Sequence, residues 1–191
     1  MARPGTFVKI PKNRIGALIG PDASTKGLIE NKLGVQLEVD SESGNVTVTL
    51  SPEASDPSML FRAKEVVSAI GRGFSPEKAR RLVEDEEAML MVIDLRDFVG
   101  KSESDIKRLS GRIIGKEGKT RRVIEELTDT YVSVYGHTVS IIGTIEEAEI
   151  ARQAVEMFIR GRLHASVYRF LNAKRRELKK KKMELWKKPY E

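Results

Sequence analysis

The most informative part of this sequence is a basic loop between two short helical segments, Ile113-Ile114-Gly115-Lys116-Glu117-Gly118-Lys119-Thr120-Arg121-Arg122. Glycine lets a nucleic-acid backbone approach closely because it has no Cβ. Free N–H groups at the start of the following helix attract an anion, and the four cations of the loop add positive charge. Ile113 and Ile114 are expected to lie in an apolar floor on which bases rest. The loop is therefore predicted to clamp the phosphates of a single-stranded nucleic acid.

An earlier copy of this pattern lies in the first half of the chain. The segment Gly16-Ala17-Leu18-Ile19-Gly20 aligns with Gly111-Arg112-Ile113-Ile114-Gly115, and Thr25 then aligns with Thr120. After a shorter turn in the second copy, Gly73 aligns with Gly161. A period of this length indicates a duplicated domain rather than a solenoid of short repeats.

Both copies predict the same order of elements, β-α-α-β-β-α. Short strands rich in branched apolar residues begin each copy, and a long amphipathic helix ends it. The predicted strands are 6–10, 36–39 and 46–50 in the first copy and 89–95, 131–134 and 138–142 in the second, and the closing helices are 57–72 and 145–160. A glycine-x-x-glycine loop is common by itself. Within this repeated frame it is typical of a KH domain, which holds four nucleotides of a single strand.

The predicted fold class is α+β, with two tandem type I KH domains and a basic C-terminal helix. Each domain is expected to have a three-stranded antiparallel sheet with helices on one face. The predicted boundaries are 1–73 for the first domain, 74–88 for a linker helix, 89–161 for the second domain and 162–191 for the basic helix and tail. The second domain is predicted to bind RNA through Arg112, Ile113, Ile114, Gly115, Lys116, Glu117, Gly118, Lys119, Arg121 and Arg122.

The first copy is predicted to have lost the phosphate clamp. Its corresponding residues are Gly20-Pro21-Asp22-Ala23, in which proline removes a donor, aspartate repels a phosphate and alanine replaces the second glycine. This domain is therefore expected to act as a scaffold or as a surface that docks a protein. The alternative is that it binds RNA through Lys12, Arg14 and Lys26.

The net charge of +6 is unevenly distributed along the chain. From residue 160 to residue 191 there are 12 Lys and Arg residues against 3 Glu, whereas the preceding residues are slightly acidic. Such a tail is typical of proteins that bind a polyanion. An apolar stripe that includes Leu163, Val167 and Leu171 is expected to dock the last helix on the body. Secondary contacts with nucleic acid are assigned to Lys179, Lys180, Lys181 and Lys182.

Several classes of protein are disfavoured by what the sequence lacks. It has no cysteine, no apolar run long enough to span a bilayer and no secretory signal, so a cytoplasmic protein without membrane contact is expected. No metal or cofactor is predicted. His137 and His164 have no cysteine or second histidine nearby to pair with. A nucleotide-binding P-loop needs a glycine five residues before Gly118 of Gly118-Lys119-Thr120, and that position is Ile113. The chain is therefore not expected to be an enzyme, and its oligomeric state stays open.

The whole chain resembles the archaeal members of a KH-domain family that acts in small-subunit ribosome assembly and rRNA processing. The resemblance rests on residues 93–98 and 110–121, on Gly143-Thr144, on the Gly161-Arg162-Leu163-His164 junction and on the lysine-rich end. It implies binding of single-stranded (pre-)rRNA near the 3′ end of 16S rRNA. It also implies docking of the endonuclease that matures this end, which the related eukaryotic factor partners. The alternatives are a protein adaptor, or a translation-associated or other single-stranded nucleic-acid-binding protein without a specific rRNA role.

Overall fold

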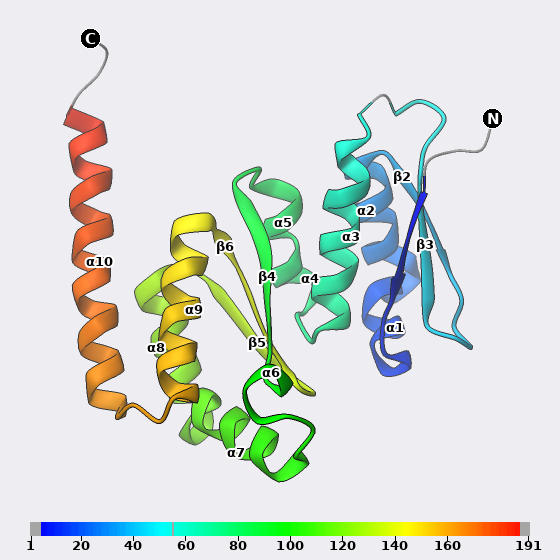
Figure 1. The fold of residues 1–191 in the computed structure, drawn as a ribbon. Helices are drawn as coiled ribbons and strands as arrows, with labels where there is room; N and C mark the ends of the chain where they lie inside the picture. Colours follow the sequence, from blue (N-terminus) through cyan, green and yellow to red (C-terminus); the bar gives the residue numbers. More distant parts are fainter. Residues whose placement is uncertain (1–4, 55, 188–191) are drawn as a thin grey trace. The chain divides into compact units, whose positions relative to one another are not determined.

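The computed structural model of the chain describes residues 5–54 and 56–187. The chain divides into two compact units, residues 1–91 and 92–191 (Figure 1). Each sheet has three strands, and helices accompany it in the order predicted from the sequence. The predicted α+β class, with one three-stranded sheet in each unit and a C-terminal helix, is therefore confirmed.

The first unit builds one sheet of three strands, in the order β1 (Gly5–Lys9), β3 (Asn45–Leu50) and β2 (Val35–Val39). The last strand in the sequence therefore lies in the middle, and both pairings are antiparallel. Val46, Val48 and Leu50 of the central strand are buried, whereas the residues between them are not, because side chains alternate across a strand. The elements are β1 (Gly5–Lys9), α1 (Lys12–Ile19), a 3-10 turn (Pro21–Ala23), α2 (Ser24–Leu33), β2 (Val35–Val39), β3 (Asn45–Leu50) and α3 (Ser58–Gly71). Helix α3 contributes a continuous buried face of Ala63, Val66, Val67 and Ile70 to the core.

Two four-residue helices, α4 (Pro76–Ala79) and α5 (Arg81–Glu84), occupy the segment predicted as a linker helix. Ser75 caps α4, since its side chain accepts a hydrogen bond from the N–H of Lys78 at 3.4 Å. Ala79 and Leu82 are completely buried, and both helices contact α3 of the first unit. This segment is therefore a packed part of the first unit rather than a free connector.

The second unit repeats the arrangement, with strand order β4-β6-β5. Strand β6 is buried along almost its whole length, and Thr144 and Glu147 form a capping box that begins the following helix. The elements are β4 (Ala88–Asp94), α6 (Arg96–Val99), α7 (Glu103–Ile114), a 3-10 turn (Lys116–Gly118), α8 (Lys119–Thr128), β5 (Tyr131–Tyr135), β6 (Thr138–Thr144), α9 (Ile145–Ile159) and α10 (His164–Lys187).

The basic helix α10 packs on α8 and α9 through the predicted stripe, because Val167 and Leu171 are completely buried. Leu163 is 73% exposed, so its inclusion in the stripe was wrong. The physical reason is that α10 begins one residue later, at His164, and helical periodicity does not extend to a residue outside the helix. Within the described ranges, the structure contains no helix with the length and apolarity needed for a membrane span.

Candidate nucleic-acid interface

The loop from Gly115 to Gly118 joins α7 to α8 as a tight turn. The N–H of Gly115 donates to the carbonyl of Gly111 at 2.8 Å, and the N–H of Gly118 donates to the carbonyl of Gly115 at 3.2 Å. Lys116 and Glu117 lie at the tip, where both are exposed. Hydrogen bonds within the chain therefore hold the loop in shape and present its tip to the solvent.

The two glycines of this loop have different tasks. Gly115 has φ 73° and ψ 176°, a conformation that is essentially restricted to glycine. A Cβ at this position would lie 2.2 Å from Oγ1 of Thr120, so no larger residue fits. Gly118 has φ 75° and ψ 13°, and the nearest atom to a Cβ there would be Nη2 of Arg121 at 3.7 Å. Gly115 is needed to close the turn, whereas Gly118 leaves space in front of α8.

The first copy keeps the backbone shape of this loop although its sequence has changed. Gly20 has φ 73° and ψ 173°, close to the values of Gly115. Asp22 has φ 49° and ψ 34°, compared with φ 52° and ψ 29° for Glu117. Ala23 takes the place of the second glycine at φ 58° and ψ 23°, in the left-handed region that disfavours a Cβ. The first copy has therefore kept the geometry of the clamp and lost only its chemistry.

The chemical difference between the copies is a loss of cations. The second loop and the first turn of its helix carry Lys116, Lys119, Arg121 and Arg122 against Glu117, whereas the matching residues of the first copy include only Lys26 against Asp22. Asp22 does not by itself set the first copy apart, because the intact loop has the carboxylate of Glu117 at the same position. Pro21, Ser24 and Gly27, which stand in place of Lys116, Lys119 and Arg122, make the difference.

A groove of about 630 Å³ lies in the second unit and reaches the loop at Ile114. One wall is the face of α7 formed by Ile106, Ser110 and Ile114, and the other is formed by Val134 of β5 and His137 of the following turn. Oγ of Ser110 is buried and has no hydrogen-bond partner in the part of the chain that the structure describes. The charged residues that line the groove are the cations Arg96, Lys101 and Lys107 and one carboxylate, Glu103. The groove thus combines an apolar floor, cations that outnumber carboxylates, and the buried hydroxyl of Ser110.

A fixed ion pair stands at one end of this groove. The guanidinium of Arg96 donates to both carboxylate oxygens of Asp94, with Nη2 at 2.6 Å from Oδ2 and Nε at 3.0 Å from Oδ1. These hydrogen bonds lower the pKa of Asp94 to about 2. Nε2 of His137 lies 3.7 Å from the same carboxylate. Because Asp94 stays ionised at neutral pH, it holds Arg96 in a defined position at the groove.

Two family models match the chain, one for each unit. Residues 8–85 match the Krr1 KH1 domain, and residues 89–176 match the eukaryotic type KH-domain, KH-domain type I. The second match extends into α10, beyond the boundary at residue 161 predicted from the sequence.

Relatives similar to the whole chain are found in archaea, and a more distant one in a fish. The KH domain-containing protein MJ0443 of Methanocaldococcus jannaschii is 50% identical over 182 residues, which are 95% of this chain and 79% of that protein. RNA-binding protein PNO1 of Oryzias latipes is 29% identical over 141 residues, which are 74% of this chain and 58% of that protein. The crystal structure of the a/eIF2alpha-aDim2p-rRNA complex from Pyrococcus horikoshii contains a chain that is 44% identical, with a TM-score of 0.86 over 92% of this chain and 96% of that chain.

The chain belongs to the archaeal KH-domain family of ribosome-assembly factors. The family resemblance seen in the sequence is therefore confirmed.

For this family member, the structure brings most of the predicted loop residues to one surface. Lys116, Glu117, Lys119 and Arg122 are exposed, and Nη2 of Arg122 donates to the carbonyl of Glu117 at 2.8 Å. Ile113 is completely buried, so its assignment to the apolar floor was wrong. Residues 113 and 114 are neighbours on α7 and point in different directions, so that only the second of them lines the groove.

Two arginines near the loop are partly engaged within the second unit. Arg112 donates through Nη2 to the carbonyl of Arg162, which ties α7 to the segment before α10. Nε of Arg121 lies 3.9 Å from Oε2 of Glu125, one helical turn away. Contacts of both side chains with RNA stay a prediction.

The predicted secondary contacts differ in how free their side chains are. Lys12 and Lys179 are exposed. Nζ of Lys26 lies 3.8 Å from Oε1 of Glu30, one helical turn away. Lys181 forms an ion pair with Glu146 at the start of α9. Nζ of Lys180 lies 3.8 Å from Oε1 of Glu184. The side chain of Lys182 falls outside the part of the chain that the structure describes.

Arg14, which the sequence offered as a possible RNA contact of the first domain, is engaged within the first unit. Its Nε donates to the carbonyl of Ile70 at 2.8 Å, and its Nη2 donates to the carbonyl of Phe74 at 2.6 Å. The side chain is only partly exposed and joins α1 to the end of α3. Arg14 therefore has a structural role.

Replacing Arg14 with methionine is expected to destabilise the first unit by about 2 kcal/mol, since two carbonyl groups lose a charged donor. The affinity for RNA is expected to stay the same. Urea denaturation and RNA titration of the same samples measure both effects. Lys12→Met, on the same helix but exposed, is the matched control and should change stability by less than about 0.5 kcal/mol. If Arg14→Met keeps its stability and loses affinity for RNA, Arg14 would be a binding residue and not a structural one.

Most of the residues that line the groove were not predicted from the sequence. Ile106, Ser110 and Ile114 recur at four-residue spacing, so helical periodicity could have indicated one wall of it. The other wall could not be found in this way, because Val134 and His137 meet α7 only through the packing of the sheet. Arg96 is held at the groove by its hydrogen bonds to Asp94. The two residues are two positions apart in the sequence, and this spacing does not by itself predict a contact.

Proposed function

We propose that this protein binds single-stranded small-subunit rRNA near its 3′ end through the second KH domain. The observation that carries the proposal is the continuity of the exposed basic loop at 115–118 with the groove between α7 and β5. The loop can hold phosphates, and the groove can hold the bases that follow them. Ile114 offers an apolar contact to a base, and Lys101 and Lys107 line the same groove.

The relatives support an RNA-binding role. One of them is named an RNA-binding protein, and another was crystallised in a complex that contains rRNA. The position near the 3′ end rests on the family resemblance in the sequence.

The first domain is proposed to dock a protein, in particular the endonuclease that matures the rRNA end. Its loop has the shape of a KH clamp with a single cation, so it is poorly suited to phosphate. In this proposal residues 1–73 dock the protein and residues 89–161 bind the RNA, as predicted from the sequence. The exposed lysines of α10 make secondary contacts with the RNA.

A titration with short single-stranded RNAs, tiled along the 3′ region of small-subunit rRNA, tests the RNA assignment. One segment is expected to bind at least about tenfold more tightly than its neighbours at equal salt, because base contacts in the groove add about 1.4 kcal/mol or more. The measurement is fluorescence anisotropy at several salt concentrations. Uniform binding with a steep salt dependence would assign the affinity to the basic tail and contradict a sequence-selective groove.

A translation-associated role is the second candidate, and one observation favours it. The solved complex of the archaeal relative contains a/eIF2alpha together with rRNA. A pull-down of purified a/eIF2alpha by this protein, with and without RNA, distinguishes this role. Binding that needs no rRNA segment would favour it over a role in 3′-end processing.

A further inference from the structure

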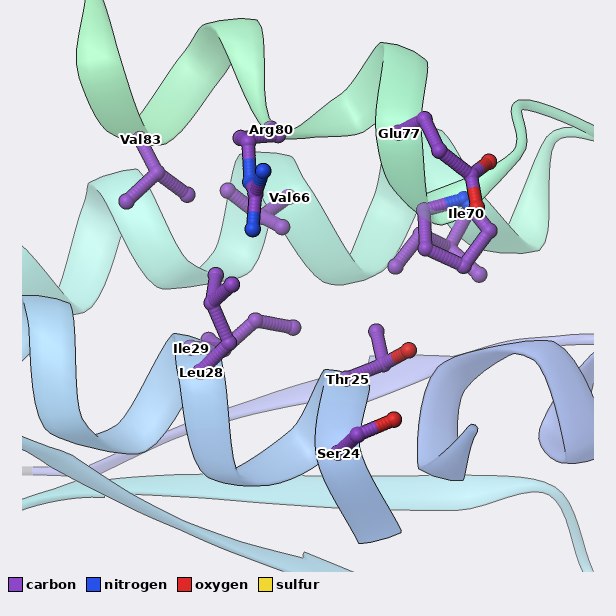
Figure 2. A pocket seen from close by; sticks show the side chains of 10 residues that line it. Ser24, Thr25, Leu28, Ile29, Val66, Ile70, Glu77, Arg80 and Val83 are labelled. Atoms are coloured by element: carbon purple, nitrogen blue, oxygen red, sulfur yellow. The ribbon is translucent and has the colours of Figure 1, made fainter. Parts of the chain in front are cut away.

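A pocket of about 220 Å³ opens in the first unit between α2, α3 and the short helices α4 and α5 (Figure 2). Its walls are mostly apolar, with Leu28 and Ile29 from α2 and Val66 and Ile70 from α3. The hydroxyl-bearing residues Ser24 and Thr25 lie at one side, and Pro76, Glu77, Arg80 and Val83 close the other. In Figure 2, Arg80 reaches from the short helices toward Leu28 across the space.

The duplication identifies the counterpart of this pocket in the second unit. With Gly73 aligned to Gly161, Pro76 aligns with His164 and Arg80 aligns with Tyr168. The alignment has a structural basis, because Pro76 begins α4 as His164 begins α10. Ala79 and Val167, which also correspond, are both completely buried. The two short helices of the first unit thus stand in the place of the first turns of α10.

Aromatic side chains fill the counterpart in the second unit. The hydroxyl of Tyr168 lies 3.3 Å from Oγ1 of Thr120, the residue that corresponds to Thr25. The ring of His164 lies 4.9 Å from the ring of Phe158 and 6.1 Å from that of Tyr168. In the first unit the three rings are replaced by Pro76, Ile70 and Arg80, which leaves the pocket open.

The open pocket has the size and chemistry for one aromatic ring. A cavity of about 150 Å³ lined by apolar side chains can hold benzene, and this pocket of about 220 Å³ is larger. Thr25 offers the hydroxyl that its counterpart Thr120 places beside a phenol. Arg80 offers a guanidinium, which is attracted to the face of an aromatic ring.

We propose that this pocket receives an aromatic side chain, tyrosine in particular, from a protein that docks on the first domain. The proposal rests on the protein-docking role given above to this domain. A nucleobase is disfavoured as the occupant, because the adjoining loop lacks the cations of the second copy and Glu77 stands at the pocket.

The probe that tests the pocket is p-cresol, which is the side chain of tyrosine. It is titrated into the full chain while the methyl signals of Val66, Ile70 and Val83 are followed by NMR. We expect these signals to shift, with saturation at millimolar concentrations. Arg80→Tyr should fill the pocket from within, as Tyr168 does in the second unit, and weaken p-cresol binding by at least about tenfold. Arg80→Ala is the matched control, since it removes the same guanidinium and leaves the pocket open, so that binding persists.

Three results would overturn the proposal. The first is that p-cresol causes no shifts, and the second is that it causes the same shifts in Arg80→Tyr as in the unchanged chain. The third is that adenosine shifts these methyl signals and p-cresol does not, which would assign the pocket to a nucleobase. The titration uses no RNA, and the substitution Gly118→Asp should leave the p-cresol shifts unchanged. A failure of this proposal can therefore be distinguished from a failure of the proposed RNA-binding function.

Discussion

Replacing Gly118 with aspartate is expected to weaken the binding of single-stranded RNA by at least about 100-fold, or about 2.7 kcal/mol. The loss is electrostatic, because the new carboxylate stands in the open space in front of α8, where a phosphate is proposed to sit. The domain should remain folded, since a Cβ at this position meets nothing closer than 3.7 Å and aspartate tolerates left-handed backbone angles. Fluorescence anisotropy with the tightest RNA segment measures the change in affinity.

The first copy supplies the matched control for this experiment. Ala23 has the position and the left-handed conformation that correspond to Gly118. Ala23→Asp adds the same charge to the loop that is proposed not to bind RNA, so the affinity should change by less than about twofold. Equal losses in both variants would mean that the effect is a general charge repulsion, and the clamp assignment would be wrong.

Replacing Gly115 with alanine is expected to have the largest effect on stability, about 3–5 kcal/mol in the second unit. The new Cβ would lie 2.2 Å from Oγ1 and 2.7 Å from Cβ of Thr120, and 2.8 Å from the backbone nitrogen of that residue. Thr120 is buried and bonded to Tyr168, so it has little freedom to move away. Hydrogen exchange of the β5 and β6 amides reports the loss in this unit alone.

Gly118→Ala is the control for this second prediction. It places a Cβ in the left-handed region without a steric overlap, so a cost of about 1–2 kcal/mol is expected. Equal destabilisation by the two substitutions would show that Gly115 is not the residue that closes the turn.

The glycine loops and the strands could be predicted from the sequence because they depend on neighbouring residues. Strand β6 was predicted as 138–142 and extends over Thr138–Thr144, and helix α9 was predicted as 145–160 and extends over Ile145–Ile159. The alternation of apolar residues in strands and their spacing in helices are local properties of the sequence. Because the domain is duplicated, the same pattern appears twice. The sequence also showed which loop has the cations.

Local patterns in the sequence could not show which side chains are bonded or buried within the fold and which are free to bind a ligand. Arg14 and Lys12 are both cations on α1, yet only the first is bonded to carbonyls near residue 70, more than fifty positions away. Ile113 and Ile114 are identical in type, and their difference arises from which side of α7 faces the core. Asp22 was read by its charge alone, without its counterpart Glu117.

The order of elements, the duplication and the position of the basic loop follow from the sequence alone, since each depends on spacing along the chain. The groove beside α7 and the pocket beside Thr25 depend on the tertiary structure, because their walls come from segments that are distant in sequence. The pocket illustrates the reason most clearly. Arg80 and Tyr168 occupy equivalent positions, and only packing against the helices of each unit reveals that one leaves a space that the other fills.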